Sequence, residues 1–433
     1  MTALFQQLIL DAQQQEYFTG TPRRIHIEML PGKATVLIGV RRCGKSTFLN
    51  QVLARLLSDG VDPKNILYIN FFDDRLKGMN PTGLDKLLEA YFLLYPAKKG
   101  NEKIFCFFDE IQTVPDWEPF IDRILRTENC EVYLSGSSAD LLSREIATQM
   151  RGRALSWELF PFSFAEFLDH QKISPDLPFS TAHKLELRNA FESYWEQGGF
   201  PEVFDQTRLL RIKLHQEYLA SILFRDLIER HDIPHPRALV DLAHRLINQA
   251  GSLYTLNGLT NFLKSLGHKV PKMSVSDYLM WFEDAYFLFT VRMFDASWHK
   301  SNANPKKIYC IDHSLIRSVS TGILVNSGHW LENLVFVALR RKYSEIYYYR
   351  TRNNQEVDFL CIGMTGEKEL YQVSESLVNP AIRKREIQAL HTAMEETGLQ
   401  SGTLITRTDE EKIIVDRKTI EVVPVWKFLL EFR

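Results

Sequence analysis

Cysteine is scarce in this chain, and the few cysteines are scattered. The 433 residues contain five, with no C-x-x-C pair: Cys43, Cys106, Cys130, Cys310 and Cys361. An odd number of isolated cysteines argues against a disulfide framework and against a zinc site. No stretch approaches the roughly 20 apolar residues that a membrane-spanning helix needs, and the first residues lack the basic start and apolar run of a secretion signal. We therefore expect a cytoplasmic protein with no membrane segment.

A surplus of charge of either sign is also missing. The chain has 52 Lys and Arg against 54 Asp and Glu, which excludes a generally polycationic nucleic-acid binder but leaves local basic patches possible. Internal repeats and low-complexity tracts are absent from the sequence as well. Because 45% of the residues are hydrophobic, the chain can bury several cores, and its length predicts about two or three domains.

What the sequence does contain is a complete phosphate-binding loop. Residues 39–46 read GVRRCGKS, which matches the pattern G-x-x-x-x-G-K-S. The apolar residues 34–38 predict a strand before the loop, and apolar residues at helical spacing follow it over 46–57. Glycines let the backbone fold around phosphate oxygens, while the helix start offers N–H donors and a positive dipole end. The predicted nucleotide-binding residues are Gly39, Val40, Arg41, Arg42, Cys43, Gly44, Lys45, Ser46 and Thr47.

Two side chains of this loop have distinct predicted roles. Lys45 should reach the β- and γ-phosphates of a nucleoside triphosphate. The Ser46 hydroxyl should hold Mg²⁺, because the ion bridges the same two phosphates and prefers hard oxygen ligands. We therefore expect ATP and Mg²⁺ as the bound groups.

A second motif identifies the acidic partner of the loop. The continuous apolar run over residues 104–108 predicts a central parallel strand, and it ends in Asp109 and Glu110. Asp109 would bind Mg²⁺ through water, and Glu110 would polarise the water that attacks the γ-phosphate. An adjacent Asp-Glu pair favours hydrolysis over phosphoryl transfer, so we predict an ATPase.

Further polar residues follow this pair at expected distances along the chain. A third strand at residues 132–134 runs into the sequence SGSS, where Ser137 is a candidate sensor beside the attacking water; these serines could equally turn the chain and cap a helix. Arg151 and Arg153 could neutralise charge developing on the phosphate, in their own subunit or in a neighbour's. Either arginine could instead form a surface salt bridge. Action across subunits would require a homo-oligomer.

With these motifs in place, the chain resembles a family of prokaryotic ATP-binding proteins that join an AAA-type P-loop ATPase domain to a C-terminal domain of long-unknown function. The resemblance covers most of the chain. The matching stretches are GVRRCGKST, FFDEIQ, LSGSSADLLS, RGRALSWELFPFSFAEF, GGFPE, GHWLENLVFVALRR and RTRNNQEVDFL. The Walker elements occur in many families, whereas ELFPFSFAEF together with GGFPE is much more particular.

The resemblance implies an α/β protein of four parts. The first is an AAA-type ATPase domain with an ASCE-type parallel sheet, and a helical lid, a winged-helix unit and a fold like that of PD-(D/E)XK restriction nucleases follow. The implied boundaries are 1–160, 161–235, 236–315 and 316–433.

The pattern of the third part is compatible with a winged helix. Three helices are expected at 239–247, 256–266 and 274–282. Two strands are expected at 286–291 and 307–310, with a basic loop at 297–306 between them. The region 236–350 contains 14 Lys and Arg against 8 Asp and Glu, which suits contact with a phosphate backbone. Asp277, Glu283 and Asp284 on the third helix argue against base-specific reading. Winged helices also serve as protein-docking modules, so both partners stay open.

The C-terminal part carries an altered nuclease signature. Restriction-type nucleases bind Mg²⁺ with an acidic residue on a helix, an Asp on a strand and an E-x-K on the next strand. The matching positions are Glu332, Asp358 and the pair Gln372 and Ser374, so the E-x-K has become Q-x-S. Glutamine brings no charge for the ion, and serine does not replace the lysine. We predict a degenerate site that binds DNA or serves structure; a variant active nuclease is the alternative.

Together these features predict an AAA-type ATPase that binds DNA and remodels it or translocates on it, in junction processing or in defence against foreign DNA. The alternative is a nucleotide-controlled switch that binds another protein through the winged helix. A small-molecule kinase is disfavoured by the Asp109-Glu110 pair and by the lack of a recognisable acceptor site.

Overall fold

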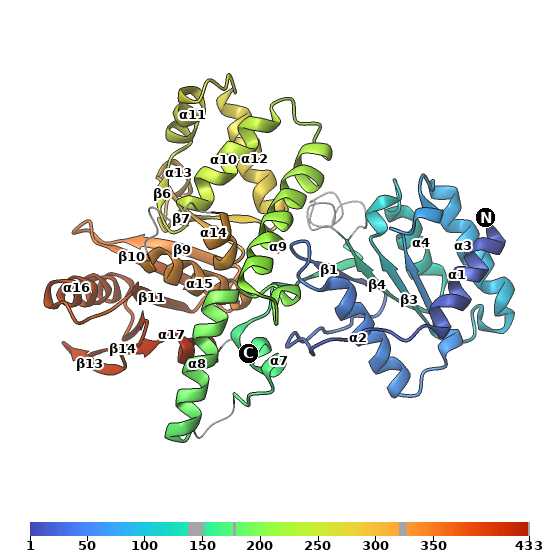
Figure 1. Ribbon diagram of the computed structural model, residues 1–433, viewed down its shortest axis with the longest axis horizontal. Coiled ribbons are helices and arrows are strands. Elements are labelled where there is room, and N and C mark those ends of the chain that lie inside the picture. Colours follow the sequence, from blue (N-terminus) through green and yellow to red (C-terminus); the bar gives the residue numbers. More distant parts are fainter. Residues whose placement is uncertain (137–149, 151, 176–178, 320–326, 432–433) are drawn as a thin grey trace. The chain divides into compact units, whose positions relative to one another are not determined.

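The computed structural model describes residues 1–433 except 137–149, 151, 176–178, 320–326 and 432–433 (Figure 1). The chain forms two compact units, Met1–Phe160 and Pro161–Arg433. Each unit has its own sheet. The further division of the second unit into a lid, a winged helix and a nuclease-like part stays a prediction.

Unit 1 is built on a five-stranded parallel sheet with the order β2-β3-β4-β1-β5. Its strands are β1 (Ala34–Ile38), β2 (Ile66–Asn70), β3 (Ile104–Asp109), β4 (Cys130–Ser135) and β5 (Ala154–Glu158). Every residue of β1 and β3 is buried, as expected for parallel strands with helices on both faces. The predicted α/β class with a parallel P-loop sheet is confirmed.

The helices of unit 1 cover both faces of this sheet. They are α1 (Thr2–Gln14), α2 (Lys45–Ser58), α3 (Pro81–Leu94) and α4 (Glu118–Thr127). The crossover from β1 to β2 through α2 runs along the sheet in the direction opposite to the crossovers through α3 and α4. Since such connections are right-handed, α2 lies on one face and α3 and α4 lie on the other, as Figure 1 shows.

Unit 2 contains a mixed sheet of nine strands, ordered β13-β14-β12-β11-β10-β9-β7-β8-β6. The strands are β6 (Leu253–Tyr254), β7 (Leu288–Met293), β8 (Lys306–Cys310), β9 (Glu345–Arg350), β10 (Glu356–Ile362), β11 (Lys368–Ser374), β12 (Ser401–Thr406), β13 (Glu411–Val415) and β14 (Lys418–Pro424). The parallel pairing of β7 with β9 joins the hairpin of β7 and β8 to the C-terminal strands. One sheet therefore runs across the boundary that the resemblance implies at residue 315.

Most of the remaining residues of unit 2 are helical. The α-helices are α7 (Phe164–Gln171), α8 (Thr181–Gln197), α9 (Arg208–Ser221), α10 (Pro236–Asn248), α11 (Leu256–Ser265), α12 (Lys272–Asp284), α13 (Trp298–Ala303), α14 (His313–Val319), α15 (Ser327–Lys342), α16 (Pro380–Thr397) and α17 (Val425–Leu429). A π-helical segment, Ile222–Glu229, continues α9.

The elements predicted for 236–310 are present with two differences. The three helices are α10, α11 and α12, and the two strands are β7 and β8. Strand β7 begins two residues later than predicted because Tyr286 has a left-handed backbone, with φ 54°, which ends an extended run. The predicted polar loop contains the short helix α13, whose first turn is capped by the Ser297 side chain.

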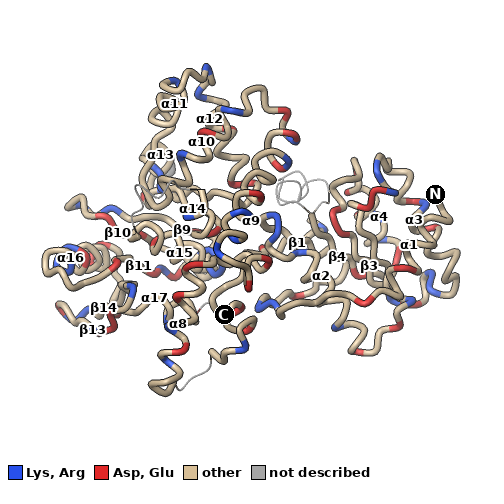
Figure 2. Tube along the Cα trace, in the orientation of Figure 1, with Lys and Arg blue, Asp and Glu red and all other residues tan. Residues whose placement is uncertain are grey.

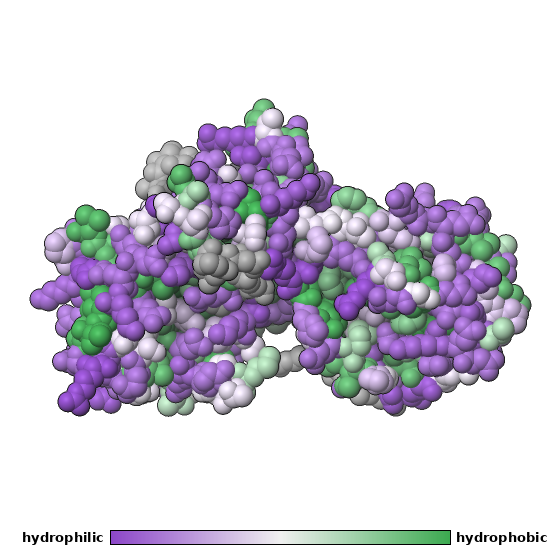
Figure 3. All heavy atoms as spheres, turned by 90° about the horizontal axis from the view of Figure 1, so that it is seen from below, coloured by the Kyte–Doolittle hydropathy of each residue, from purple (hydrophilic) through white to green (hydrophobic). Residues whose placement is uncertain are grey.

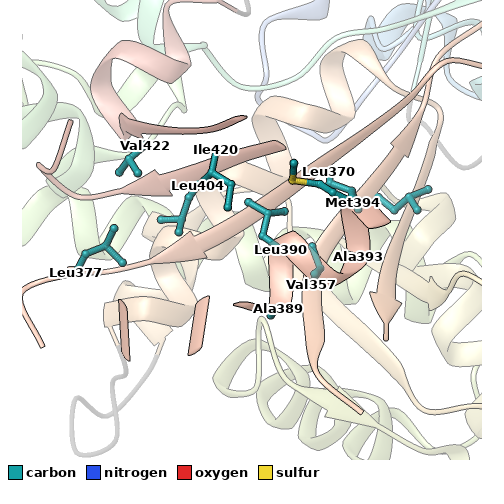
Figure 4. Packing of buried hydrophobic residues seen from close by; sticks show 11 residues of the cluster. Val357, Leu370, Leu377, Ala389, Leu390, Ala393, Met394, Leu404, Ile420 and Val422 are labelled. Carbon is teal, nitrogen blue, oxygen red and sulfur yellow. The ribbon is translucent and has the colours of Figure 1, made fainter. Parts of the chain in front are cut away.

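The C-terminal strands are covered on both faces. Figure 4 shows α16 packed on the sheet through Leu390, Ala393 and Met394 against Leu370 and neighbouring strand residues. The next residue of β11, Tyr371, instead contacts Tyr343 after α15 and Phe428 of α17. Because successive strand residues face opposite sides, α16 covers one face, and α15 and α17 cover the other.

The GGFPE motif has a packing role in unit 2. The Gly199 N–H donates to Asp312 Oδ2 at 2.6 Å, and the Gly199 carbonyl accepts from the Phe162 N–H at 2.6 Å. Gly198 has φ 79°, and a Cβ there would overlap the side chains of Asp312 and Ser314. The motif therefore ties the ELFPFSFAEF stretch to the residues after β8, and only glycine leaves room for this close approach.

A buried histidine that contacts Ser314, next to this motif, predicts that unit 2 is less stable in acid. His215 is buried, its Nε2 lies 3.1 Å from Ser314 Oγ, and burial lowers its pKa to about 4. The folded protein keeps this imidazole neutral, whereas an unfolded histidine takes up a proton near its usual pKa of about 6.5. The free energy of unfolding should therefore fall as the pH drops from about 6.5 to about 4, by up to about 1.4 kcal/mol per pH unit for this group.

Urea unfolding followed between pH 7 and pH 4 tests this dependence. In His215→Gln the free energy of unfolding should depend less steeply on pH than in wild type, because one proton fewer is taken up on unfolding. This difference in slope should hold even if the variant is less stable at pH 7. An exposed histidine, His26, provides the matched control, and His26→Gln should keep the wild-type slope. A wild-type slope in His215→Gln would contradict the assignment.

The surface carries apolar side chains in small groups. On the face shown in Figure 3, hydrophilic residues predominate and hydrophobic ones are dispersed among them. None of the helices in the described part of the chain combines the length and the apolar character needed to cross a bilayer.

Candidate nucleotide-binding site

Three polar segments of unit 1 meet at one edge of the parallel sheet. The phosphate-binding loop follows β1, Asp109 is the last residue of β3, and Ser135 is the last residue of β4. These strands are neighbours in the order β3-β4-β1. Since parallel strands have their carboxyl ends at the same edge, the loop and both side chains lie together, where open α/β sheets bind ligands.

The loop has the backbone that a phosphate cradle requires. Gly44 has φ 100° at the position before α2, a conformation that favours glycine. A Cβ on Gly39 would overlap the carbonyl oxygen of Leu159, so this position also requires glycine. The Lys45 side chain is buried, and its Nζ donates to the carbonyls of Gly39 at 2.9 Å and Val40 at 3.1 Å. The lysine ammonium thus lies within the loop that would surround the phosphates.

Asp109 is fully buried and held by two hydroxyls. Ser135 Oγ donates to its Oδ1, and the Tyr68 hydroxyl donates to its Oδ2 at 3.2 Å. Burial, with the nearby Asp109 carboxylate, raises the pKa of Tyr68 well above its usual value, so this phenol stays a proton donor. Ser46, exposed at the first turn of α2, adds a hydroxyl oxygen. A carboxylate and a hydroxyl are the hard ligands that Mg²⁺ prefers, so these residues fit the ion.

Glu110 lies one residue beyond the strand in a left-handed conformation, with φ 55°. This uncommon backbone for a non-glycine residue turns the chain sharply after Asp109. The Gln112 side-chain amide donates to Glu110 Oε2. The carboxylate is therefore oriented by a neighbouring amide at the same sheet edge as the loop.

Sequence reasoning missed a segment that contacts the loop. Arg23 Nη1 donates to the carbonyl of Cys43 at 2.8 Å, and its Nη2 donates to the carbonyl of Phe160 at 2.6 Å. Gln51 of α2 donates to the carbonyls of Thr19 and Thr21. The chain before β1 thus lies along α2 beside the loop. No motif marks these residues, and Tyr68 and Ser135 were missed for the same reason.

The remaining candidates of the ATPase site lie elsewhere or outside the described residues. Ser137 and Arg151 fall in the undescribed segments. Arg153 directly precedes β5 at the amino edge of the sheet, the edge opposite the loop, and its Nε lies 3.1 Å from Asp122 Oδ1. Within one chain Arg153 is therefore a salt-bridge residue away from the loop. Action on a neighbouring subunit stays a prediction.

The nuclease-like residues of unit 2 come together only in part. Glu332 of α15 and Asp358 of β10 both contact Lys307 Nζ at 2.8 Å. Gln372 accepts from the Asp358 N–H at 3.1 Å, but its amide donates to Glu386 of α16 at 2.7 Å. The Ser374 hydroxyl donates to the carbonyl of Ser376 at 3.3 Å. The sequence pattern missed Lys307, which lies far from the motif on β8.

Three family models match the chain in succession. An AAA domain matches residues 31–168. Two domains of unknown function follow, DUF8612 at residues 188–324 and DUF4143 at residues 327–428. The AAA match contains the loop, Asp109, Glu110 and Ser135 but not Arg23. Lys307 lies in the second matched region, and Glu332 and Asp358 lie in the third.

Two relatives cover most of the chain, one of them nearly its full length. The uncharacterized protein MJ1544 of Methanocaldococcus jannaschii is 36% identical over 99% of this chain and 96% of its own length. An uncharacterized protein of Haemophilus influenzae is 28% identical over 75% of this chain and 78% of its own. Among solved structures, the Walker-type ATPase PABY2304 of Pyrococcus abyssi has a TM-score of 0.43 and 14% identity, with 74% of this chain and 95% of that chain covered.

Proposed function

The chain belongs to one family with the archaeal protein MJ1544 and contains an AAA domain, and we propose that unit 1 hydrolyses ATP and that unit 2 uses the resulting change of state to remodel DNA or to translocate on it. The observation that supports hydrolysis is the meeting of Lys45, Asp109 and Glu110 at one sheet edge. Each of these side chains supplies a different part of phosphoryl transfer to water.

The roles of these residues follow from their positions. Loop N–H groups and the Lys45 ammonium hold the phosphates and balance their charge. Ser46 and Asp109 would hold Mg²⁺, which neutralises charge on the β- and γ-phosphates. Glu110 accepts a proton from the attacking water, and Gln112 keeps its carboxylate turned to that task. Tyr68 and Ser135 hold Asp109 in place from behind.

The proposal that DNA is the partner rests on unit 2. Helices α10, α11 and α12 followed by the hairpin of β7 and β8 have the order of a winged helix. Three lysines at the turn between α11 and α12 are exposed: Lys264, Lys269 and Lys272. Figure 2 shows Lys and Arg, and Asp and Glu, spread over both units of the described chain, and a further basic run, Arg340–Lys342, ends α15. We propose that the three lysines of the turn contact phosphates, which gives affinity without sequence preference.

The exposed side of α12 argues against base reading. Met273 and Met280 are 73% and 51% exposed, and neither side chain can donate to a base edge. Methionine side chains adapt to varied apolar partners. This feature supports the second candidate, a nucleotide-controlled switch in which α12 docks another protein.

One experiment separates the two candidates. ATP turnover by the full-length chain is measured alone and with linear, branched and single-stranded DNA and RNA, and particle mass is measured in ATP. The DNA proposal predicts stimulation by at least one nucleic acid. Turnover that no nucleic acid changes would reject it and favour the protein switch. A single-chain mass in ATP would reject the proposal of a homo-oligomer with an arginine acting across subunits.

Replacing the three exposed lysines of the α11–α12 turn by alanine tests the contact surface. DNA affinity should fall, and the slope of log affinity against log salt should decrease by up to about 3, since each phosphate contact contributes about 0.9. The matched control replaces three exposed lysines elsewhere in unit 2, Lys184, Lys213 and Lys412, and should leave the slope unchanged. Equal slopes in both triple variants would place DNA on another surface.

A further inference from the structure

A buried lysine in unit 2 is surrounded by carboxylates. The Lys307 side chain is 3% exposed, and its Nζ lies 2.8 Å from one oxygen each of Glu332, Glu356 and Asp358. An ammonium has three N–H donors. Lys307 Nζ donates to Glu332 and Asp358 and forms an ion pair with Glu356, so the side chain ends inside a cage of three acidic groups, which we term the carboxylate cage.

The cage is built from segments that are far apart in the sequence. Lys307 comes from β8, Glu332 from α15, and Glu356 and Asp358 from β10. The Glu332 carboxylate is also held by a residue outside the cage, because the Tyr309 hydroxyl donates to Glu332 Oε1 at 2.6 Å. The pairing of β10 with β9 shifts register between Val357 and Leu360. Such an irregularity redirects side chains locally, here at Asp358.

Acidic groups outnumber cations in the cage. Besides Lys307, the guanidinium of Arg350 lies near, with Nη2 3.6 Å from Glu356. Three carboxylates thus face one central ammonium and one peripheral guanidinium. Breaking such a buried cluster by removing its cation leaves uncompensated negative charge, which is costly. The cage therefore requires a cation at its centre.

We propose that the Lys307 ammonium occupies the place of a divalent cation, so that the cage is a cation site closed by the chain itself. Carboxylate oxygens from a helix and a strand are the ligands that Mg²⁺ and Mn²⁺ prefer. The 2.8 Å separations suit N–H···O bonds, whereas a Mg²⁺–oxygen contact is about 2.1 Å. Accordingly, within the described residues no group of Asp, Glu, His or Cys is spaced for a metal ion.

The proposal predicts that unit 2 does not act as a metal-dependent nuclease. Loss of the E-x-K at Gln372 and Ser374 removes one ligand charge and one catalytic ammonium. Lys307 then fills the position that the ion would need, since its Nζ contacts both Glu332 and Asp358. The inference is independent of ATP hydrolysis in unit 1.

Removing the ammonium should open the cage to a metal ion. The full-length chain is compared as wild type, Lys307→Ala and Lys306→Ala, with Mn²⁺ as the probe. Mn²⁺ binding is measured by electron paramagnetic resonance, and thermal unfolding is measured with and without the ion. Without Mn²⁺, Lys307→Ala should unfold at a lower temperature than wild type, and Mn²⁺ should restore its stability. The variant should bind a single Mn²⁺ ion with a dissociation constant at least about tenfold lower than that of wild type.

The neighbouring Lys306 is the matched control, because successive strand residues face opposite sides; Lys306→Ala should respond to Mn²⁺ as wild type does. Lys307→Ala with Asp358→Asn should lose the added Mn²⁺ affinity. If Lys307→Ala does not fold alone, the double variant Lys307→Ala and Glu332→Gln removes one repelling carboxylate and keeps two ligands, and it should fold and bind Mn²⁺ more tightly than wild type does.

Three outcomes would overturn the proposal. The first is a folded Lys307→Ala that binds Mn²⁺ no better than wild type. The second is failure of both Lys307→Ala and its double variant to fold even when refolded with Mn²⁺, because a metal ion then does not replace the ammonium. The third is wild-type DNA cleavage with Mg²⁺ or Mn²⁺ that Asp358→Ala abolishes.

Discussion

Glu110→Gln should bind ATP as tightly as wild type and hydrolyse it about 10²- to 10⁴-fold more slowly, the range that general-base catalysis contributes. The amide keeps the size of the side chain but does not accept a proton from water. Since the Glu110 carboxylate is held by Gln112 at the sheet edge that carries the loop, its loss should affect the chemical step and leave binding intact. Single-turnover hydrolysis and equilibrium binding of ATP measure the two separately.

The matched control for this variant is Glu89→Gln, at an exposed position of α3 in the same unit. It removes the same charge away from the loop and should hydrolyse ATP at the wild-type rate. A Glu110→Gln variant with unchanged turnover would show that another group activates the water. If any nucleic acid stimulates the wild type, the same ligand should bind Glu110→Gln in ATP without being released.

Lys45→Ala should lose both ATP binding and hydrolysis. The buried ammonium, held by the carbonyls of Gly39 and Val40, is the cation placed to balance the β- and γ-phosphates. Loss of one such group from a phosphoryl-transfer site lowers turnover by about 10²- to 10³-fold, and weaker binding adds to this effect. Turnover at saturating ATP and the dissociation constant for ATP are the two measurements.

Lys86→Ala, at an exposed position of α3, is the control for the lost charge. Circular dichroism should show that Lys45→Ala is folded, because its contacts lie within one loop. Lys45→Ala and Glu110→Gln thus differ in a way that a general loss of structure would not produce: only the second should still bind ATP. Wild-type affinity in Lys45→Ala would exclude this loop as the phosphate site.

The loop and the acidic pair at the sheet edge could be predicted because their chemistry is local in sequence, whereas Arg153 lies at the opposite edge. A phosphate cradle needs consecutive N–H groups at a helix start, and these come from one loop next to one strand. Asp109 and Glu110 end another strand, so the residue types and their position suffice. Arg23, Tyr68 and Ser135 were missed because they act through contacts across the fold, and no spacing rule connects such residues to the loop.

In unit 2, less of the arrangement could be predicted from the sequence. The sequence pattern predicted the helices and strands of 236–310, and it identified Glu332 and Asp358. It did not predict that β7 pairs with β9 and extends one sheet across the expected domain boundary. Strand pairing depends on which edges meet in space, and sequence periodicity carries no information on that. The particular GGFPE motif likewise indicates a family, whereas its packing role against Asp312 needed coordinates.

The sequence by itself determined that this chain binds a nucleoside triphosphate and has an acidic pair suited to hydrolysis, because loop and strand end are contiguous segments with required residue types. Only the tertiary structure showed that a lysine pairs with two of the nuclease-like residues, Glu332 and Asp358. Lys307 lies 25 residues from Glu332 and 51 from Asp358 along the chain, and only folding brings its ammonium between their carboxylates. Electrostatics acts through distance in space, so the charge that closes this cage is not visible in any linear motif.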